Sequence, residues 1–226
     1  MKTESLGGFD RFRVPAALLV IAIHTGPLLS LNGEANYLLT DILARIAVPF
    51  FFSVSGWFLV PRLFREGRAA LIPFVKKLLL LYGAAVLLYL PLNLYNHTLE
   101  ESGFALLRDV LFNGTFYHLW YFPALVLGAC LVYGLLRILG PRWAWLPALL
   151  LYAAGLLGDS YFGLTAALPP LRAGYEALFL LFDYTRNGLF FPPVFLLLGG
   201  WLALRPARRS ARADGACRWC GSVPAG

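Results

Sequence analysis

The residues best suited to chemistry lie in the first apolar segment, FDRFRVPAALLVIAIHTGPL. Arg13 stands just before the apolar run, and His24 follows eleven residues later. In an α-helix, eleven residues make about three full turns plus ~20°, so both side chains share one face and lie about 16 Å apart along the axis. This spacing predicts a fixed cation at one mouth of a membrane helix and a proton-accepting imidazole near the bilayer midplane.

Such a pair suits the transfer of an acyl group from an anionic donor. Arg13 could hold a phosphate or carboxylate of the donor. His24 could act as a general base on a hydroxyl, or could carry the acyl group itself. The alternative is that Arg13 is a positively charged anchor and His24 a hydrogen-bonding residue inside the bundle. Ionisable groups inside a membrane helix are rare, which gives the functional interpretation equal weight.

The second apolar segment carries further candidates around the stretch PFFFSVSGWFL. Ser53, Ser55 and Gly56 are small residues that let helices approach closely. The Phe50–Phe52 block could wall a pocket for an acyl chain, although simple lipid-facing phenylalanines are the more frequent case. Arg45 lies within a turn of the outer end, where its side chain could also extend outward to water.

Two further sets of candidates open later apolar segments. His118 and Trp120 stand where an aromatic belt is expected, and His118 could instead orient an acceptor. Arg186 follows closely after Asp183 and could pair with it. Cys217 and Cys220 form a CxxC without a second pair or a histidine cluster. That pattern is weak evidence for zinc or redox chemistry, so no metal site is expected.

The elements that position these residues must be membrane helices. Of the 226 residues, 59% are hydrophobic and only 14% are charged, whereas a soluble domain carries about 25% charged residues. Six apolar runs are long enough to cross, or nearly cross, a bilayer. They are Val14–Leu31, Ile42–Val60, Leu78–Tyr95, Leu119–Leu139, Trp143–Leu157 and Gly188–Leu204. The sequence therefore predicts an all-α, polytopic membrane helix bundle with about six transmembrane helices.

The distribution of charge predicts the orientation. Most Lys and Arg residues fall in alternate connections between the runs, as they do in cytoplasmic segments. Those on the other side, or just inside a span, are Arg45, Arg108, Arg172 and Arg186. We therefore expect both termini on the cytoplasmic side of the cell membrane. The net charge of +7 does not predict nucleic-acid binding, because the basic residues stand at the ends of apolar runs.

Two segments lie outside this regular pattern. Leu171–Phe182, in the long outer connection, mixes charged and apolar residues and predicts an interfacial or re-entrant helix; a seventh crossing is the second choice. From Pro206 the chain is rich in Arg, Ala and Gly. We expect a transmembrane domain over residues 1–205 and a basic, disordered tail over residues 206–226, which could also arise from a frameshift.

Taken together, these motifs resemble the acyltransferase-3 family of polytopic membrane O-acyltransferases. The family pattern is matched by Asp10, Arg13 and His24, then by the stretch Val48–Gly56, and then by His118–Phe122. The resemblance implies transfer of an acyl group, often acetyl, from cytosolic acyl-CoA to a hydroxyl acceptor such as a cell-envelope sugar. It implies essential roles for Arg13 and His24.

Further residues are expected to bind the donor or the acceptor. The resemblance implies no bound cofactor. The substrate-binding residues expected are Asp10, Arg45, Ser55, His118 and Trp120. The expected partners are the lipid bilayer, acyl-CoA and the hydroxyl acceptor. Members of the family usually have about ten helices, so six helices suggest the N-terminal portion of a ten-helix fold.

Within the family, the same motifs are most similar to the membrane half of the serine/alanine racemases of vancomycin-resistance clusters. Those proteins continue into a cytosolic racemase domain, for which these 226 residues have no counterpart, so racemase activity is not expected. Two alternatives to an acyltransferase follow from this likeness and from the helix count. The chain could be a non-enzymatic transport or partner module, or an inactive truncated fragment.

Overall fold

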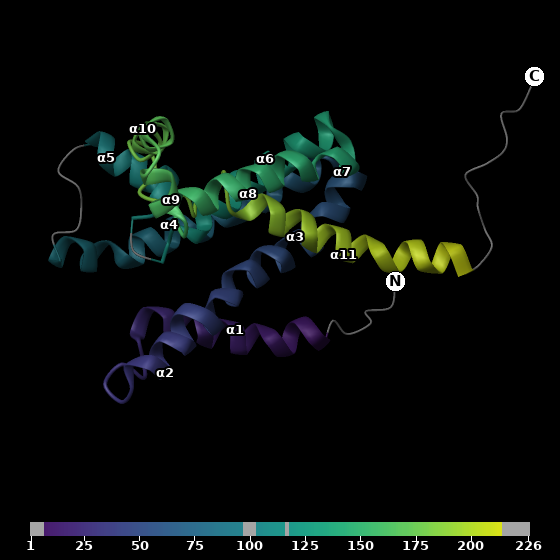
Figure 1. Ribbon diagram of the computed structural model, residues 1–226. Coiled ribbons are helices and arrows are strands. Elements are labelled where there is room, and N and C mark those ends of the chain that lie inside the picture. The colour runs from purple at the N-terminus through teal and green to yellow at the C-terminus, as the bar shows by residue number, and fades with distance from the viewer. Residues whose placement is uncertain (1–6, 97–102, 116–117, 214–226) are drawn as a thin grey trace, which may run out of the picture.

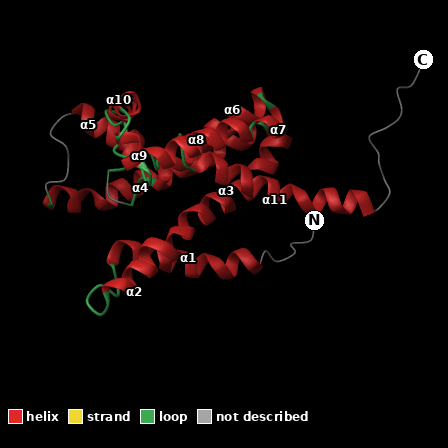
Figure 2. Ribbon diagram, viewed as in Figure 1, coloured by secondary structure: helices red, strands yellow, loops and turns green. Residues whose placement is uncertain are grey.

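A computed structural model describes residues 7–96, 103–115 and 118–213, with side chains described between residues 10 and 205 of these ranges. All regular elements in this part of the chain are helices (Figure 2). The first half comprises α1 (Gly7–Thr25), α2 (Gly33–Tyr37), the π turn η1 (Leu38–Leu43), the 3₁₀ turn η2 (Ala44–Ile46), α3 (Ala47–Glu66) and α4 (Arg68–Tyr95). The second half comprises α5 (Gly103–Arg108), the π turn η3 (Asp109–Asn113), α6 (Tyr121–Ile138), α7 (Gly140–Trp143), α8 (Trp145–Gly158), α9 (Phe162–Ala166), α10 (Pro169–Leu178) and α11 (Pro192–Ala213).

The apolar runs of the sequence coincide with helices. Three described helices are long and apolar enough to cross a membrane, namely Gly33–Glu66, Arg68–Tyr95 and Tyr121–Ile138, and Pro192–Arg205 is a shorter apolar helix. The chain is thus a helical membrane protein, as its composition predicts. The count of six spans remains a prediction, because α8 has 14 residues and α1 begins with three charged residues within its first seven positions.

The first helix is shorter than the sequence predicts. The apolar run continues to Leu31, but α1 ends at Thr25. Gly26 adopts a φ of 53°, a left-handed conformation that suits glycine, and Pro27 cannot continue the hydrogen-bonded ladder. His24 therefore lies in the last turn of α1, and not in the middle of a longer helix.

The tightest contact of the bundle joins α3 and α11. A Cβ atom on Gly56 would collide with the backbone of Leu196, and one on Gly199 would collide with the carbonyl of Ser53. The two backbones thus touch at these glycines, as small residues allow in membrane helices. This confirms the close approach predicted for Gly56. Around the contact lies a core that includes Phe52, which is fully buried.

Figure 1 shows how the helices are arranged around α3. On one side α3 packs against α11 and α4, and α6 packs against both α4 and α11. On the other side lies α1, which contacts η1, η2 and α3. Both α1 and α4 expose rows of large apolar side chains, among them Leu18 and Ile21 on α1 and Leu87 and Leu88 on α4. Such exposed apolar faces suit a lipid environment.

The outer connection and the last helix refine two further expectations. The segment expected at Leu171–Phe182 forms α10, which begins at Pro169 and ends at Leu178. Tyr175 is buried and its hydroxyl donates to the carbonyl of Ala154 on α8 at 2.6 Å. The helix α11 continues to Ala213, beyond the domain boundary expected at residue 205. The remainder of the expected tail, including Cys217 and Cys220, lies outside the described residues.

Candidate active site

A cavity of about 730 Å³ opens between α1 and the rest of the bundle. It lies at the end where α1 finishes and α3, α6 and α11 begin, which we call the outer end. Its lining comes from five separate segments, which are in chain order Val20, Ile23 and His24; Thr40, Asp41, Arg45 and Val48; Asp109 and Asn113–Thr115; Trp120; and Asp183, Tyr184, Arg186 and Phe191. Side chains far apart in the sequence thus meet in one place.

Two histidines predicted from the sequence come together beside this cavity. The ring centroids of His24 and His118 lie 5.8 Å apart, with the rings inclined by 55°. His118 also packs edge-on against Tyr89 of α4 at 4.9 Å. Burial lowers the pKa of the His118 imidazole below its usual value of 6.5, because a charged ring loses hydration there. At neutral pH His118 is therefore a neutral ring that can accept a proton.

Arg45 reaches the cavity from the irregular start of the second long helix. Its guanidinium donates to Asp41 at 2.9 Å, and the Thr40 hydroxyl donates to the other carboxylate oxygen, also at 2.9 Å. The π turn and 3₁₀ turn of η1 and η2 bury Thr40 and leave Asp41 and Arg45 about half exposed. Irregular turns of this kind inside helices often occur at functional sites. Arg45 is thus held by a carboxylate at the cavity, and does not simply extend outward.

A second π turn, η3, lines the opposite wall. Asn113 is buried, and its amide donates to Asp109 at 2.9 Å while its side-chain oxygen accepts from the backbone N–H of Asp183 at 3.1 Å. Arg108 bridges the same two carboxylates, at 3.1 Å from Asp109 and 3.2 Å from Asp183. Tyr82 of α4 donates to the carbonyl of Val110 at 2.9 Å. The wall is therefore a connected polar network.

The pairing of Arg186 with Asp183 that the sequence suggested is wrong. Asp183 pairs with Arg108, whereas Arg186 places its Nε 2.9 Å from Asp159, at the end of α8. The Arg186 Nε is buried, and that contact does not meet hydrogen-bond geometry, so the atom lacks a directed acceptor. Arg186 and Asp159 form an ion pair without a hydrogen bond, because charge attraction tolerates poor alignment. The Arg186 side chain, which lines the cavity, is thus held at Asp159 by charge attraction and not by a directed hydrogen bond.

Arg186 also joins the main cavity to a neighbouring one. A second space of about 500 Å³ shares Asp41, Arg45, Arg186 and Phe191 with the first. The two arginines and their carboxylates therefore stand between two adjoining spaces. A polar substrate in either space would therefore meet cationic groups that donate hydrogen bonds and anionic groups that accept them.

Other predicted site residues lie elsewhere. Arg13 pairs with Asp10 at 3.1 Å near the start of α1, and neither residue lines the cavities at the outer end. Ser55 donates to the carbonyl of Phe51 in its own helix at 2.9 Å and also lies outside these cavities. The structure brings together His24, Arg45, His118 and Trp120. The catalytic and binding roles of all seven residues remain predictions.

Sequence reasoning missed the network of Arg108, Asp109 and Asn113. Its signal was a pair of opposite charges, Arg108 and Asp109, inside a stretch rich in Leu and Phe. The contact of Asn113 with Asp183, which lies beyond α10, could not be predicted from residue spacing, because the two residues are 70 positions apart. Among the described residues, no group of three or more His, Cys, Asp or Glu side chains is placed to hold a metal ion.

Comparison with known proteins adds independent evidence. A family model of the acyltransferase-3 type, described as an acyltransferase domain, matches residues 6–223. An amino-acid racemase of Enterococcus faecalis is 45% identical over 209 residues, which are 92% of this chain and 29% of that protein. A serine/alanine racemase of Enterococcus gallinarum is 43% identical over 213 residues, which are 90% of this chain and 30% of that protein. The chain thus spans less than a third of these curated relatives, and no solved structure gives a significant match.

Proposed function

Because the chain belongs to the acyltransferase-3 family, we propose that it is a multi-pass acyltransferase module of the cell membrane. It moves an acyl group, acetyl in the first instance, from cytosolic acyl-CoA to a hydroxyl of an outer acceptor such as a cell-envelope sugar. The basic residues gather at one end of the bundle, which supports the proposal that this end and both termini face the cytoplasm, with six spans between the termini.

The observation that carries this proposal is the pairing of His24 and His118 beside the outer cavity. In the proposed reaction, His24 removes the proton of the acceptor hydroxyl, and the oxygen attacks the thioester carbonyl. The new C–O bond forms, the C–S bond breaks, and the CoA thiolate takes up the proton. His118 is neutral at pH 7, because burial lowers its pKa, and it positions the same hydroxyl. In a variant of this route, His24 itself carries the acyl group.

Arg13 contributes at a distance. It lies on α1 about 16 Å along the axis from His24, a span that the extended arm of acyl-CoA can bridge. Its guanidinium is half exposed and has Asp10 as its partner at 3.1 Å, so a donor phosphate must compete with that carboxylate.

The cavity also fits a polyhydroxylated acceptor. Carboxylates only accept hydrogen bonds and guanidinium groups only donate them, and sugar hydroxyls do both. Asp41 and Arg45 offer the two kinds of group side by side. Trp120 and Tyr184 pack edge-to-face at 6.1 Å and add an aromatic wall. These features favour a hydroxyl-rich acceptor over an apolar one.

The test is acyl-CoA turnover by membranes that contain the chain. We expect His24→Gln to lower transfer by about 10²–10⁴-fold, the usual contribution of a general base, and Cys130→Ala, an exposed position on α6, to leave it unchanged. Wild-type transfer by His24→Gln would refute the mechanism. Absence of acyl-CoA-dependent product from the wild-type chain would refute the acyltransferase proposal.

One observation favours a second candidate, a transport module for a small zwitterion. The curated relatives are named amino-acid racemases, and Arg186 and Asp41 give the shared cavity region one cation and one anion for a carboxylate and an ammonium group. Uptake of labelled serine into vesicles, independent of acyl-CoA and lost in Arg186→Gln, would support it. No uptake above that of empty vesicles would exclude it.

A further inference from the structure

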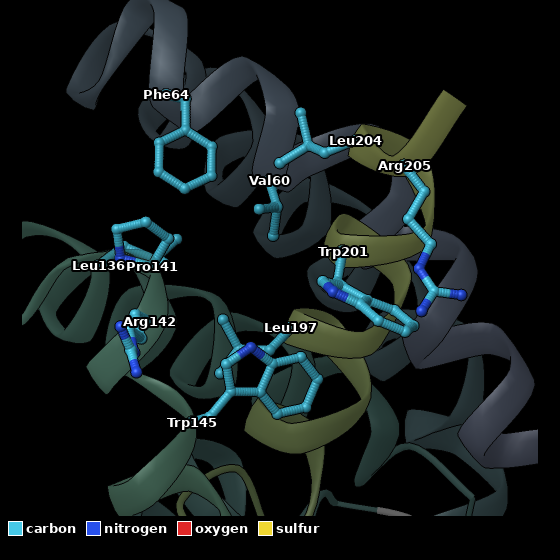
Figure 3. Close-up of a pocket in the computed structure, with 10 residues that line it drawn as sticks. All are labelled: Val60, Phe64, Leu136, Pro141, Arg142, Trp145, Leu197, Trp201, Leu204 and Arg205. Atoms are coloured by element: carbon cyan, nitrogen blue, oxygen red, sulfur yellow. The ribbon is translucent and has the colours of Figure 1, made fainter. Parts of the chain in front are cut away.

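A separate cavity of about 490 Å³ lies at the opposite end of the bundle. We call this end the basic end, because α3, α6 and α7 place Arg62, Arg65, Arg137 and Arg142 there. The lining is mostly apolar and aromatic and is drawn in Figure 3; it includes Val60, Phe64, Leu136, Trp145, Leu197 and Trp201. None of its lining residues belongs to either cavity at the outer end.

Two arginines border this apolar space. Figure 3 shows Arg142 and Arg205 on opposite sides, with Leu197 and the Trp201 indole between them. The Arg205 guanidinium lies 3.5 Å from the ring centroid of Trp201, and that of Arg142 lies 5.9 Å from the ring of Trp143. Among the described residues, neither arginine forms an ion pair. Cation–π contacts orient these cations without neutralising them.

The chemistry of the two parts of the cavity points to an amphiphile with one anionic group. The apolar wall takes a hydrocarbon chain, and the two uncompensated cations take a phosphate. Tryptophans and arginines at one end of a membrane bundle belong at the headgroup level. The cytoplasmic leaflet, which the basic end faces by the positive-inside rule, is also the anionic one.

We propose that this cavity binds an anionic phospholipid of the cytoplasmic leaflet. The anionic headgroup lies at the mouth of the cavity, which Arg142 and Arg205 border, and the upper part of one acyl chain lies along Trp145 and Leu197. The volume is within the range of small-molecule sites and suits part of a lipid whose remaining chain stays in the bilayer. The proposal is independent of the acyl-transfer reaction.

The acyl-CoA donor is the competing occupant, and the packing argues against it. A donor must present its thioester at His24, which lies on α1 at the outer end. No residue of α1 lines the basic cavity. The backbones of α3 and α11 touch at Gly56 and Gly199, beside this cavity, and close the direct route through the core.

The test measures lipid binding to the full chain in detergent by native mass spectrometry. Phosphatidylglycerol and phosphatidylcholine with identical acyl chains are compared. We expect a preference for phosphatidylglycerol that falls about 30-fold in Arg142→Gln/Arg205→Gln, as expected for the loss of two interfacial cations. The matched control is Arg62→Gln/Arg137→Gln, which removes the same charge at the same end but outside the cavity, and it keeps the preference.

Three outcomes would overturn the proposal. Equal loss in the control pair would mean general attraction to a basic surface. Displacement of phosphatidylglycerol by glycerol phosphate would mean a site for a free phosphate without an acyl chain. Displacement by acetyl-CoA would make the cavity a donor site. Thermal unfolding of each variant, measured without added lipid, shows whether a variant that loses the preference for phosphatidylglycerol is still folded.

Discussion

The two ends of the bundle hold their charges in different ways. At the outer end, ion pairs connect segments far apart in the sequence, as in Arg108 with Asp183 and Arg186 with Asp159. At the basic end, the described ion pairs Arg62–Glu66 and Arg13–Asp10 each lie within one helix, and Arg142 and Arg205 pack on tryptophan rings. The outer end is thus internally neutralised and shaped, whereas the basic end keeps positive charge available to the membrane.

This difference matches the work proposed for each end. A site that positions reacting groups needs walls fixed by several contacts, because small displacements lower the rate. The outer end has such walls in the Asn113 network. A site that binds a membrane anion needs cations that are oriented and not already paired. The α3–α11 contact stands between the two ends and keeps them apart.

The largest expected effect comes from the contact that separates the two ends. In Gly199→Ala, the added methyl collides with the carbonyl of Ser53, and the backbones must separate, which we expect to cost about 3 kcal/mol of stability. The control is Gly134→Ala on α6, where nothing lies within 4 Å of the new methyl; it should be neutral or stabilise by about 0.5–1 kcal/mol. Unfolding by SDS in mixed micelles measures both. Equal midpoints would contradict a close α3–α11 contact.

The next effect tests the wall of the outer end. In Asn113→Ala, the N–H of Asp183 loses its acceptor and the Asp109 carboxylate loses a donor, and the loss of a hydrogen bond to a charged group costs about 1.5–3 kcal/mol. The exposed Asn96 at the end of α4 provides the control, Asn96→Ala, with little expected change. The same unfolding assay compares them. If both variants unfold at the same SDS fraction, the network does not hold the wall.

How much of this contrast the sequence could predict depends on the range of the interactions. The apolar runs predicted the helices, and the small side chain of Gly56 predicted a close contact, because both are local properties of one segment. The motifs singled out His24, Arg45 and Trp120 one by one, but only the folded structure shows that the three line one cavity. The pairing of Arg108 with Asp183 could not be predicted, because it depends on how the outer connection folds back. The end of α1 depends on the left-handed conformation of Gly26 and on Pro27, which follows it.

A pH effect should distinguish the outer end further. Burial lowers the pKa of His118, so the unfolded chain binds the proton more readily than the folded one. Stability is then full above the unfolded pKa of about 6.5 and decreases as the pH falls below it. The rings of His24 and Tyr89 face His118, and a charge on His24 would oppose a charge on His118. Thermal midpoints between about pH 7.5 and 5.5 should fall less in His118→Gln; the same decrease as in wild type would exclude His118 as the source.

The smallest effect concerns an outer ion pair that joins no distant segments. Arg172 donates to Glu176 within α10 at 2.7 Å, and both side chains are more than half exposed. The hydrogen bond that Arg172 donates to Glu176 raises the pKa of Arg172, but water screens such a pair, so Arg172→Gln should leave the unfolding midpoint unchanged. Arg108→Gln, which breaks a partly buried bridge between two segments, should lower it. A larger decrease of the unfolding midpoint in Arg172→Gln than in Arg108→Gln would mean that the charged face of α10 contacts the bundle. The ion-paired region of the outer end would then extend beyond the cavity walls.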